Sequence, residues 1–364
     1  MADIDAVFKA YDVRGLAPEQ LDAELVHSIG AGFARFMADE DGTDRIVIGH
    51  DMRPTGPEFA HAFATGAMSQ GVDVIHIGLA STDMLYFASG VLDVPGAVLT
   101  ASHNPAEYNG IKMCRRAAGP LGAETGLFDI RELARSVPAP TGQGSLSEQD
   151  MLDRFAEHVL SFVDVDALSP LKVVADTANG MGGLVVPAVF DRLPFDLEIM
   201  YGELDGTFPN HPADPIQEEN QVDLKRRVLE NRAHVGLAFD GDADRVFLVD
   251  ERAEGVSGSL TTALVADRVL DAEPGATIIH NLICSKVVPE LVTEKGGTAV
   301  RTKVGHSFIK DVMAQTGAAF GGEHSGHYYF RDNYRADSGL IAAVVVLAAM
   351  AETGRALSEL VAPL

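Results

Sequence analysis

The most distinctive polar segment of the chain is DGDADR at residues 240–245, between the apolar, strand-like runs VGLAF and VFLVD. Asp240, Asp242 and Asp244 alternate in a tight turn and can converge on one hard cation, because Mg²⁺ and Ca²⁺ prefer oxygen ligands. An EF-hand would need glycine where Arg245 stands. A solvated acidic turn is the alternative, but strands on both sides favour the metal. Since Mg²⁺ can accept a phosphate oxygen, a phosphate-bearing partner is expected elsewhere.

A second polar segment, TASHNP at 100–105, follows the strand-like run GAVLT. It places the hydroxyl of Ser102 in a loop at the end of a strand, with His103 and Asn104 shaping the turn, and this position suits a nucleophile. A Ser/Asn/Pro turn without chemistry is the alternative. No Asp–His relay can be deduced from the sequence, so ordinary acyl-transfer catalysis is unsupported.

Polar side chains also gather in KVGHSF at 303–308 and in GGEHSGH at 321–327. Glu323 and Ser325 can offer hydrogen bonds to vicinal hydroxyl groups, the geometry that a sugar requires. For each histidine of these two segments a structural role is the alternative. For Arg14, near the start of the chain, the alternative is a solvated arginine.

Strands and helices must position these segments. RIVIG at 45–49 and VDVIHIG at 72–78 are short apolar runs separated by a helix-length stretch, which predicts a βαβ unit. The same order recurs after LKVVAD at 171–176 and ATIIHN at 276–281. The predicted fold is therefore α/β, with three consecutive related domains that contain mixed sheets and surround a central cleft.

Two linker-like segments predict where these domains meet. SVPAPTGQGS at 136–145 indicates a boundary near 145, followed by a helical pattern from Ser147, and ERAEGVSGS at 251–259 indicates a second boundary. The expected domains span residues 1–145, 146–255 and 256–364, and would carry the serine, the aspartates and the sugar-binding segment respectively.

The composition limits the partners and the compartment. With 28 basic against 53 acidic residues, the net charge is −25, which would repel nucleic acid and anionic membranes. A small anionic substrate then needs local cations or a metal. The two cysteines cannot form a disulfide framework, which favours a reducing compartment, by default the cytoplasm. The longest apolar run, Leu340–Met350, is about half of the roughly 20 residues that span a bilayer, and a buried helix is expected.

Taken together, FKAYDVRG, TASHNP followed by YNGIK, DGDADR, KVGHSF and GEHSGH resemble the α-D-phosphohexomutase superfamily in order and approximate spacing. The resemblance covers nearly the whole chain. AYDVRG, SHNPAEYNG, FPNHPADP at 208–215 and GEHSGH are more similar to its bacterial phosphomannomutase/phosphoglucomutase branch than to phosphoglucosamine mutase. This resemblance implies reversible interconversion of hexose 1-phosphates and hexose 6-phosphates through a phosphoserine. It also implies Mg²⁺ as cofactor and a hexose 1,6-bisphosphate as activator and intermediate.

The resemblance also implies roles for individual residues. Ser102 would be the phosphoserine, with His103 and Lys112 beside it to assist proton transfer, although the general base is not identified. Arg14, Lys112 and Arg245 would be the local cations. The metal ligands would be Ser102, Asp240, Asp242 and Asp244. In the third domain, His306 would face the sugar, Glu323 and Ser325 would bind its O3 and O4, and His327 and Lys303 would help line the site.

The chain departs from the resemblance in one respect. Typical members of the superfamily have a fourth, C-terminal domain whose loop grips the phosphate that is not being transferred, and no such loop occurs in this sequence. The expectation is weaker mutase activity with increased phosphoserine hydrolysis. The alternatives are a phosphoglucosamine mutase and a sugar-phosphate-binding protein with little mutase activity. The preference between mannose and glucose and the oligomeric state stay open.

Overall fold

Two compact units make up the described part of the chain. The computed structural model describes residues 4–364, apart from the side chains of residues 306 and 307. Unit 1 comprises residues 4–151 and Asp205–Thr207, and unit 2 comprises Leu152–Leu204 and Phe208–Leu364. Residues on both sides of position 255 belong to unit 2. The boundary expected between the second and third domains, at residue 255, therefore stays a prediction.

Unit 1 is built on one mixed sheet. Its strands are β1 (Val13–Leu16), β2 (Arg45–His50), β3 (Asp73–Leu79), β4 (Gly96–Leu99), β5 (Tyr108–Cys114) and β6 (Leu146–Glu148), in the spatial order β1-β5-β4-β2-β3-β6. β5 pairs antiparallel with both of its neighbours, whereas the other pairs are parallel. A parallel pair needs a crossover, and α3 (Gly56–Met68) supplies it between β2 and β3, as the sequence predicts.

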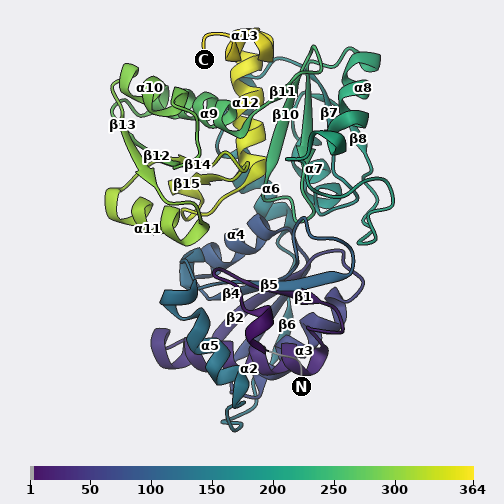
Figure 1. The fold of residues 1–364 in the computed structure, drawn as a ribbon, viewed down its shortest axis with the longest axis vertical. Coiled ribbons are helices and arrows are strands. Elements are labelled where there is room, and N and C mark those ends of the chain that lie inside the picture. The colour runs from purple at the N-terminus through teal and green to yellow at the C-terminus, as the bar shows by residue number, and fades with distance from the viewer. Residues whose placement is uncertain (1–3) are drawn as a thin grey trace. The chain divides into compact units, whose positions relative to one another are not determined.

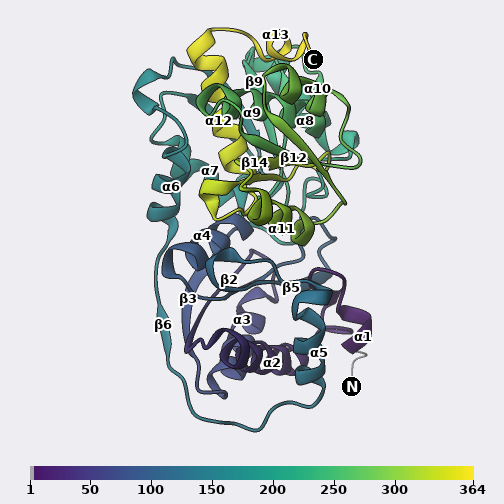
Figure 2. The same ribbon diagram turned by 90° about the vertical axis from the view of Figure 1, so that its left-hand side faces the viewer.

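Helices cover both faces of this sheet. They are α1 (Ile4–Val7), α2 (Ala23–Asp41), α3, α4 (Thr82–Leu92) and α5 (Leu127–Arg135), with 3₁₀ turns η1 (Arg116–Ala118) and η2 (Ala123–Thr125). Figure 2 shows α2, α3 and α5 on one face and α4 on the other. Two glycines permit the close crossing of α2 and α3. A Cβ at Gly30 would lie 2.2 Å from the carbonyl oxygen of Phe63, and one at Gly66 would lie 2.0 Å from that of His27.

Unit 2 contains two sheets, both mixed. The first consists of β7 (Lys172–Asp176), β8 (Asp196–Met200), β9 (Val235–Phe239), β10 (Val246–Asp250) and β11 (Gly255–Val256), in the order β11-β10-β9-β7-β8. The second consists of β12 (Thr277–Asn281), β13 (Thr298–Thr302), β14 (Phe320–Gly322) and β15 (Tyr328–Phe330), in the order β13-β12-β14-β15. β9 and β10 are buried at every position and pair antiparallel, so the turn between them is anchored on both sides.

A buried helix, α12 (Gly339–Thr353), runs between the two sheets of unit 2 (Figure 1). Its residues from Gly339 to Ala351 are all buried, which confirms the prediction for the apolar run that they contain. None of the helices in the described residues is long and apolar enough to cross a membrane. The other helices of unit 2 are α6 (Leu152–Leu160), α7 (Gly182–Phe190), α8 (Val222–Asn231), α9 (Gly258–Ala272), α10 (Val287–Glu294), α11 (His306–Thr316) and α13 (Leu357–Val361), with 3₁₀ turns η3 (Val165–Ala167), η4 (Glu218–Gln221) and η5 (Arg331–Asn333).

The α/β class with mixed sheets is confirmed, but the end of unit 1 differs in detail from the expectation. Residues 146–148 form β6, which pairs in parallel with β3, so unit 1 continues past 145 to Met151. The helix expected from Ser147 begins at Leu152 instead. Backbone hydrogen bonds to β3, which a local pattern does not reveal, hold this segment in the first sheet.

Candidate functional site

Ser102 lies in the loop that leads from β4 to β5 of unit 1. Its backbone adopts the left-handed conformation, with φ 49°, and its N–H donates to the hydroxyl of Thr100 at 3.0 Å. This conformation is uncommon for residues other than glycine and costs about 1–3 kcal/mol. The side-chain Oγ lies 3.2 Å from Nδ1 of His103, although Ser102 is only 2% exposed. The loop therefore brings together the serine and the histidine that the sequence singles out.

Two of the predicted cations lie in unit 1, on strands of the same sheet. The guanidinium of Arg14, on β1, donates to the carbonyl oxygen of Ala101 at 3.0 Å and to the carboxylate of Asp12 at 2.7 Å. It also donates to the side chain of Asn104. Lys112 is buried on β5, where it pairs with β4. Arg14 is thus attached directly to the serine loop, at the residues on both sides of Ser102 and His103.

The three aspartates form the turn between β9 and β10 in unit 2. Asp240, Asp242 and Asp244 are fully buried, and each offers a carboxylate oxygen within 4.8 Å of those of the other two. The turn has a left-handed residue, Ala243, with φ 60°, whose N–H donates to the carbonyl oxygen of Asp240 at 3.1 Å. Buried carboxylates are costly unless cations or donors compensate them. An all-oxygen set of this kind fits a hard divalent cation such as Mg²⁺.

Arg245 closes this turn and supplies positive charge. Its backbone N–H and its Nε donate to the two carboxylate oxygens of Asp240, at 3.1 Å and 2.9 Å. Burial disfavours the charged guanidinium, but the carboxylates of Asp240 and Asp244 outweigh it and raise the pKa of Arg245. Its Nη2 is buried and has no hydrogen-bond partner among the described residues. A donor in this position is suited to an anionic oxygen brought by a ligand.

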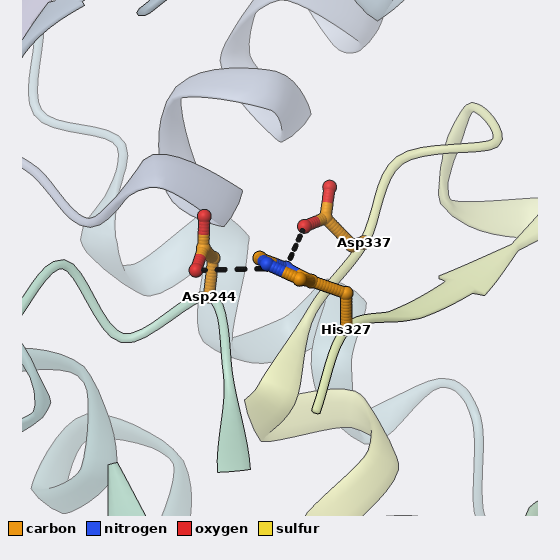
Figure 3. Close-up of side chains that lie close together, drawn as sticks. All are labelled: Asp244, His327 and Asp337. Carbon is orange, nitrogen blue, oxygen red and sulfur yellow. Dashed lines mark hydrogen bonds and ion pairs between the residues drawn. The ribbon is translucent and has the colours of Figure 1, made fainter. Parts of the chain in front are cut away.

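His327 joins the aspartate turn to the start of α12 (Figure 3). Its Nδ1 lies 2.9 Å from Oδ2 of Asp337 and 3.8 Å from Oδ1 of Asp244. Burial favours the neutral imidazole, but the two carboxylates outweigh this effect and raise the pKa of His327 above its ordinary value. The sequence motif identifies His327, whereas no motif identifies Asp337, which lies before the helix N-cap Ser338.

Glu323 is a hub of hydrogen bonds and is 1% exposed. One carboxylate oxygen accepts from the side-chain amide of Asn281 at 2.9 Å and from the N–H of Gly305 at 3.4 Å. The other accepts from the hydroxyl of Tyr329 at 2.9 Å. Glu323 therefore connects the last residue of β12 to the loop after β13, and its expected bond to a sugar hydroxyl stays a prediction.

The remaining residues of the predicted sugar site differ in their exposure. Ser325 is half-buried, and Lys303 is exposed with its Nζ 5.4 Å from the ring centre of Phe308. The backbone of His306 begins α11, but its side chain lies outside the described residues. Ser102 belongs to unit 1 and the aspartates to unit 2, so the metal contact expected for Ser102 also stays a prediction.

Comparison with protein families matches three consecutive segments of the chain. Residues 5–137, 153–255 and 257–364 match domains I, II and III of phosphoglucomutase/phosphomannomutase, each described as an alpha/beta/alpha domain. The serine loop falls in the first match, the aspartate turn in the second and Glu323 with His327 in the third.

Individual proteins give the same result. The chain is 38% identical to a phosphomannomutase of Escherichia coli K12 and to a protein named "Phosphohexose mutases" of Xanthomonas campestris, in each case over 97% of this chain and 79% of the relative. A crystal structure of a phosphoglucomutase/phosphomannomutase family protein from Burkholderia thailandensis is 34% identical, with a TM-score of 0.93 over 99% of this chain and 80% of that one. The chain therefore belongs to the phosphoglucomutase/phosphomannomutase family of the α-D-phosphohexomutase superfamily, and is a mutase of the isomerase class.

Proposed function

We propose that the chain interconverts the 1-phosphates and 6-phosphates of mannose and glucose through a phosphoryl group carried on Ser102, with a hexose 1,6-bisphosphate as intermediate. The observation that carries this proposal is the left-handed backbone of Ser102, whose Oγ contacts His103. Strained backbone of this kind is concentrated at functional sites. The names of the relatives, which include phosphomannomutase, support the choice of sugar.

In unit 1, the serine loop is suited to hold and release a phosphoryl group. Phosphoryl transfer depends chiefly on positioning and on electrostatic stabilisation of the transferred group. His103 would exchange a proton with the Oγ of Ser102, while Lys112 and Arg14 would offset the charge of the phosphoserine, about −1.5 to −2. The phosphoryl group would pass from this Oγ to the O1 or O6 of a bound hexose phosphate and return from the other oxygen.

In unit 2, Asp240, Asp242 and Asp244 would hold Mg²⁺, which when bound neutralises charge on the phosphoryl oxygens. Ser102 is proposed as the fourth protein ligand. The buried Nη2 of Arg245 would donate to a phosphate oxygen, a role supported by its lack of a partner among the described residues.

We assign recognition of the sugar to the residues around Glu323. A carboxylate has about four lone-pair sites, so Glu323 can accept from a sugar hydroxyl in addition to its three protein donors. Ser325 would bind the neighbouring hydroxyl. His306, His327 and Lys303 would complete the lining of this part of the site.

Steady-state kinetics tests the proposal. Purified chain is assayed with Mg²⁺, a trace of glucose 1,6-bisphosphate, and mannose 1-phosphate, glucose 1-phosphate or glucosamine 1-phosphate. We expect turnover of the first two substrates, its loss in Ser102→Ala, and no change in Ser136→Ala, which alters an exposed serine of the same unit. Preferential turnover of glucosamine 1-phosphate would contradict the assigned substrates. Binding of all three without turnover would indicate a sugar-phosphate-binding protein instead.

A further inference from the structure

Arg53 has one of the largest fully buried side chains among the described residues and is 1% exposed. It lies between β2 and α3, outside every motif that the sequence brings to attention. Its two terminal nitrogens each donate to two backbone carbonyl oxygens of the serine loop. The acceptors are Pro105 and Tyr108 for Nη1, both at 2.8 Å, and Ser102 and Asn104 for Nη2, at 2.9 Å and 2.7 Å.

Asp51 holds Arg53 in place from the other side. Its Oδ1 accepts from the backbone N–H of Arg53 at 2.9 Å, and its Oδ2 lies 3.3 Å from the guanidinium Nε. Gly206 packs closely against the backbone of Arg53: a Cβ at Gly206 would lie only 2.6 Å from the Cα of Arg53. A buried ion pair is weak evidence for a stabilising role, since apolar residues of similar volume often stabilise a fold equally well. The pair instead fixes the position of the Arg53 guanidinium, which binds the carbonyl oxygens of the serine loop.

The hydrogen bonds to Arg53 determine which carbonyl oxygens of the loop face the guanidinium and which N–H groups point away from it. A trans peptide directs its carbonyl oxygen and its N–H to opposite sides. Gathering the carbonyls of Ser102 and Pro105 at the guanidinium therefore turns the N–H groups of His103 and Ala106 away from Arg53. Carbonyl oxygens that faced a phosphoserine would repel its negative charge. Arg53 instead binds four carbonyl oxygens of this segment through its guanidinium.

We propose that Arg53 is a positioning residue for phosphoryl transfer, which fixes the loop of residues 102–108 and holds Ser102 in its left-handed conformation. This inference rests on the proposed role of Ser102 as the phosphoryl carrier. Lysine cannot replace Arg53, because a single ammonium on a flexible stem lacks the planar fork of donors that reaches four carbonyls. Arg53→Lys therefore keeps the positive charge at this position but removes the set of donors that binds the four carbonyl oxygens.

The experiment compares the wild-type chain with Arg53→Lys, Arg53→Ala and the control Arg45→Lys, which alters an exposed arginine of the same unit. Glucose 1,6-bisphosphate is added with Mg²⁺, and the rate of phosphorylation of Ser102 is followed by mass spectrometry. Values of kcat and KM for mannose 1-phosphate and the hydrogen exchange of all peptides are measured on the same samples. Arg53→Ala is repeated with methylguanidinium, which can occupy the space that the side chain leaves.

We expect phosphorylation of Ser102 and kcat to fall about 100-fold in Arg53→Lys, with KM within about twofold, because a small misplacement of reacting groups costs a factor of this size. Hydrogen exchange should accelerate in residues 101–108 but not in the strands of the sheet. Methylguanidinium should restore kcat of Arg53→Ala to at least about a tenth of the wild-type value, because it can supply the missing donors to the same carbonyl oxygens. The Arg45→Lys control should match the wild type.

Other outcomes overturn the inference. Exchange accelerated across the whole sheet of unit 1, or a failure of both Arg53 variants to fold even with methylguanidinium, would make Arg53 a general stabilising residue. If the wild type is labelled and Arg53→Lys is labelled at the same rate, this inference alone fails. If the wild type is not labelled at Ser102, the proposed function fails first, so the two failures are distinguishable.

Discussion

Arg245 and Asp240 hold each other within one turn, since the Nε of Arg245 donates to Oδ2 at 2.9 Å and its backbone N–H donates to Oδ1 at 3.1 Å. The arginine thereby keeps the carboxylate of Asp240, a proposed metal ligand, in place, while its own Nη2 is buried without a partner among the described residues. A single side chain would thus connect the proposed metal site to the proposed recognition of a phosphate.

Arg245→Lys should lower kcat/KM for mannose 1-phosphate by about 10- to 100-fold. Lysine cannot donate both to Asp240 and to a phosphate, and a charge-assisted hydrogen bond contributes about 1.5–3 kcal/mol. Initial rates over a range of substrate concentrations measure the loss. Arg252→Lys, which changes an exposed arginine of the same unit, should behave as the wild type. An unchanged kcat/KM in Arg245→Lys would remove this residue from the site.

Neutralising one aspartate of the turn should have opposite effects on stability and on metal binding. Asp242→Asn should raise the Tm of the metal-free chain, because it relieves repulsion among three buried carboxylates. It should also abolish the rise in Tm expected when Mg²⁺ is added to the wild type, since Mg²⁺ at 100 times its Kd would stabilise the folded chain by about 2.7 kcal/mol. Thermal melts with Mg²⁺ and with EDTA test both effects. The exposed Asp196→Asn is the control, and a full Mg²⁺-dependent shift in Asp242→Asn would argue against the metal site.

Gly180→Ala should weaken Mg²⁺ binding without touching a ligand. A Cβ at Gly180 would lie 2.6 Å from the carbonyl oxygen of Gly241, in the aspartate turn, and the N–H of Met181 donates to that oxygen at 2.8 Å. Residues that support metal ligands typically affect affinity by about 10- to 100-fold. Titration calorimetry gives the Kd. Gly255→Ala, whose Cβ would meet no atom closer than 3.6 Å, is the matched control. Equal affinities in the two variants would count against this packing.

The stability of unit 2 should depend on pH through His211. Its Nε2 lies 3.0 Å from Oδ2 of Asp176. Burial alone would lower the pKa of His211, but the hydrogen bond and charge of Asp176 outweigh it and raise the pKa above the ordinary 6.5. Folding then favours the protonated form, so this contribution is complete below pH about 6.5 and is lost as pH rises through the folded pKa.

Thermal melts between pH 6 and 9, with Mg²⁺ absent, measure this dependence. The Tm of the wild type should fall more over this range than that of His211→Gln, and Asp176→Asn should also flatten the curve. Parallel curves for the wild type and both variants would show that the ion pair does not contribute in this way.

Local patterns predicted much of the fold and part of the site. The βαβ unit and the turn between β9 and β10 could be predicted because their apolar runs and polar turns are contiguous in sequence. Arg53 could not, because its acceptor Ser102 lies 49 positions away and nothing local marks the bond. The hydrogen bond from Asn281 to Glu323, which spans 42 positions, could not be predicted for the same reason.

Locating the phosphoryl group tests the role of Ser102 most directly. The purified chain is incubated with glucose 1,6-bisphosphate and Mg²⁺, its intact mass is measured, and the modified residue is identified by fragmentation of its peptides. We expect one added phosphoryl group, on Ser102, and none in Ser102→Ala. A phosphoryl group on another residue, or equal labelling of Ser102→Ala, would contradict this role.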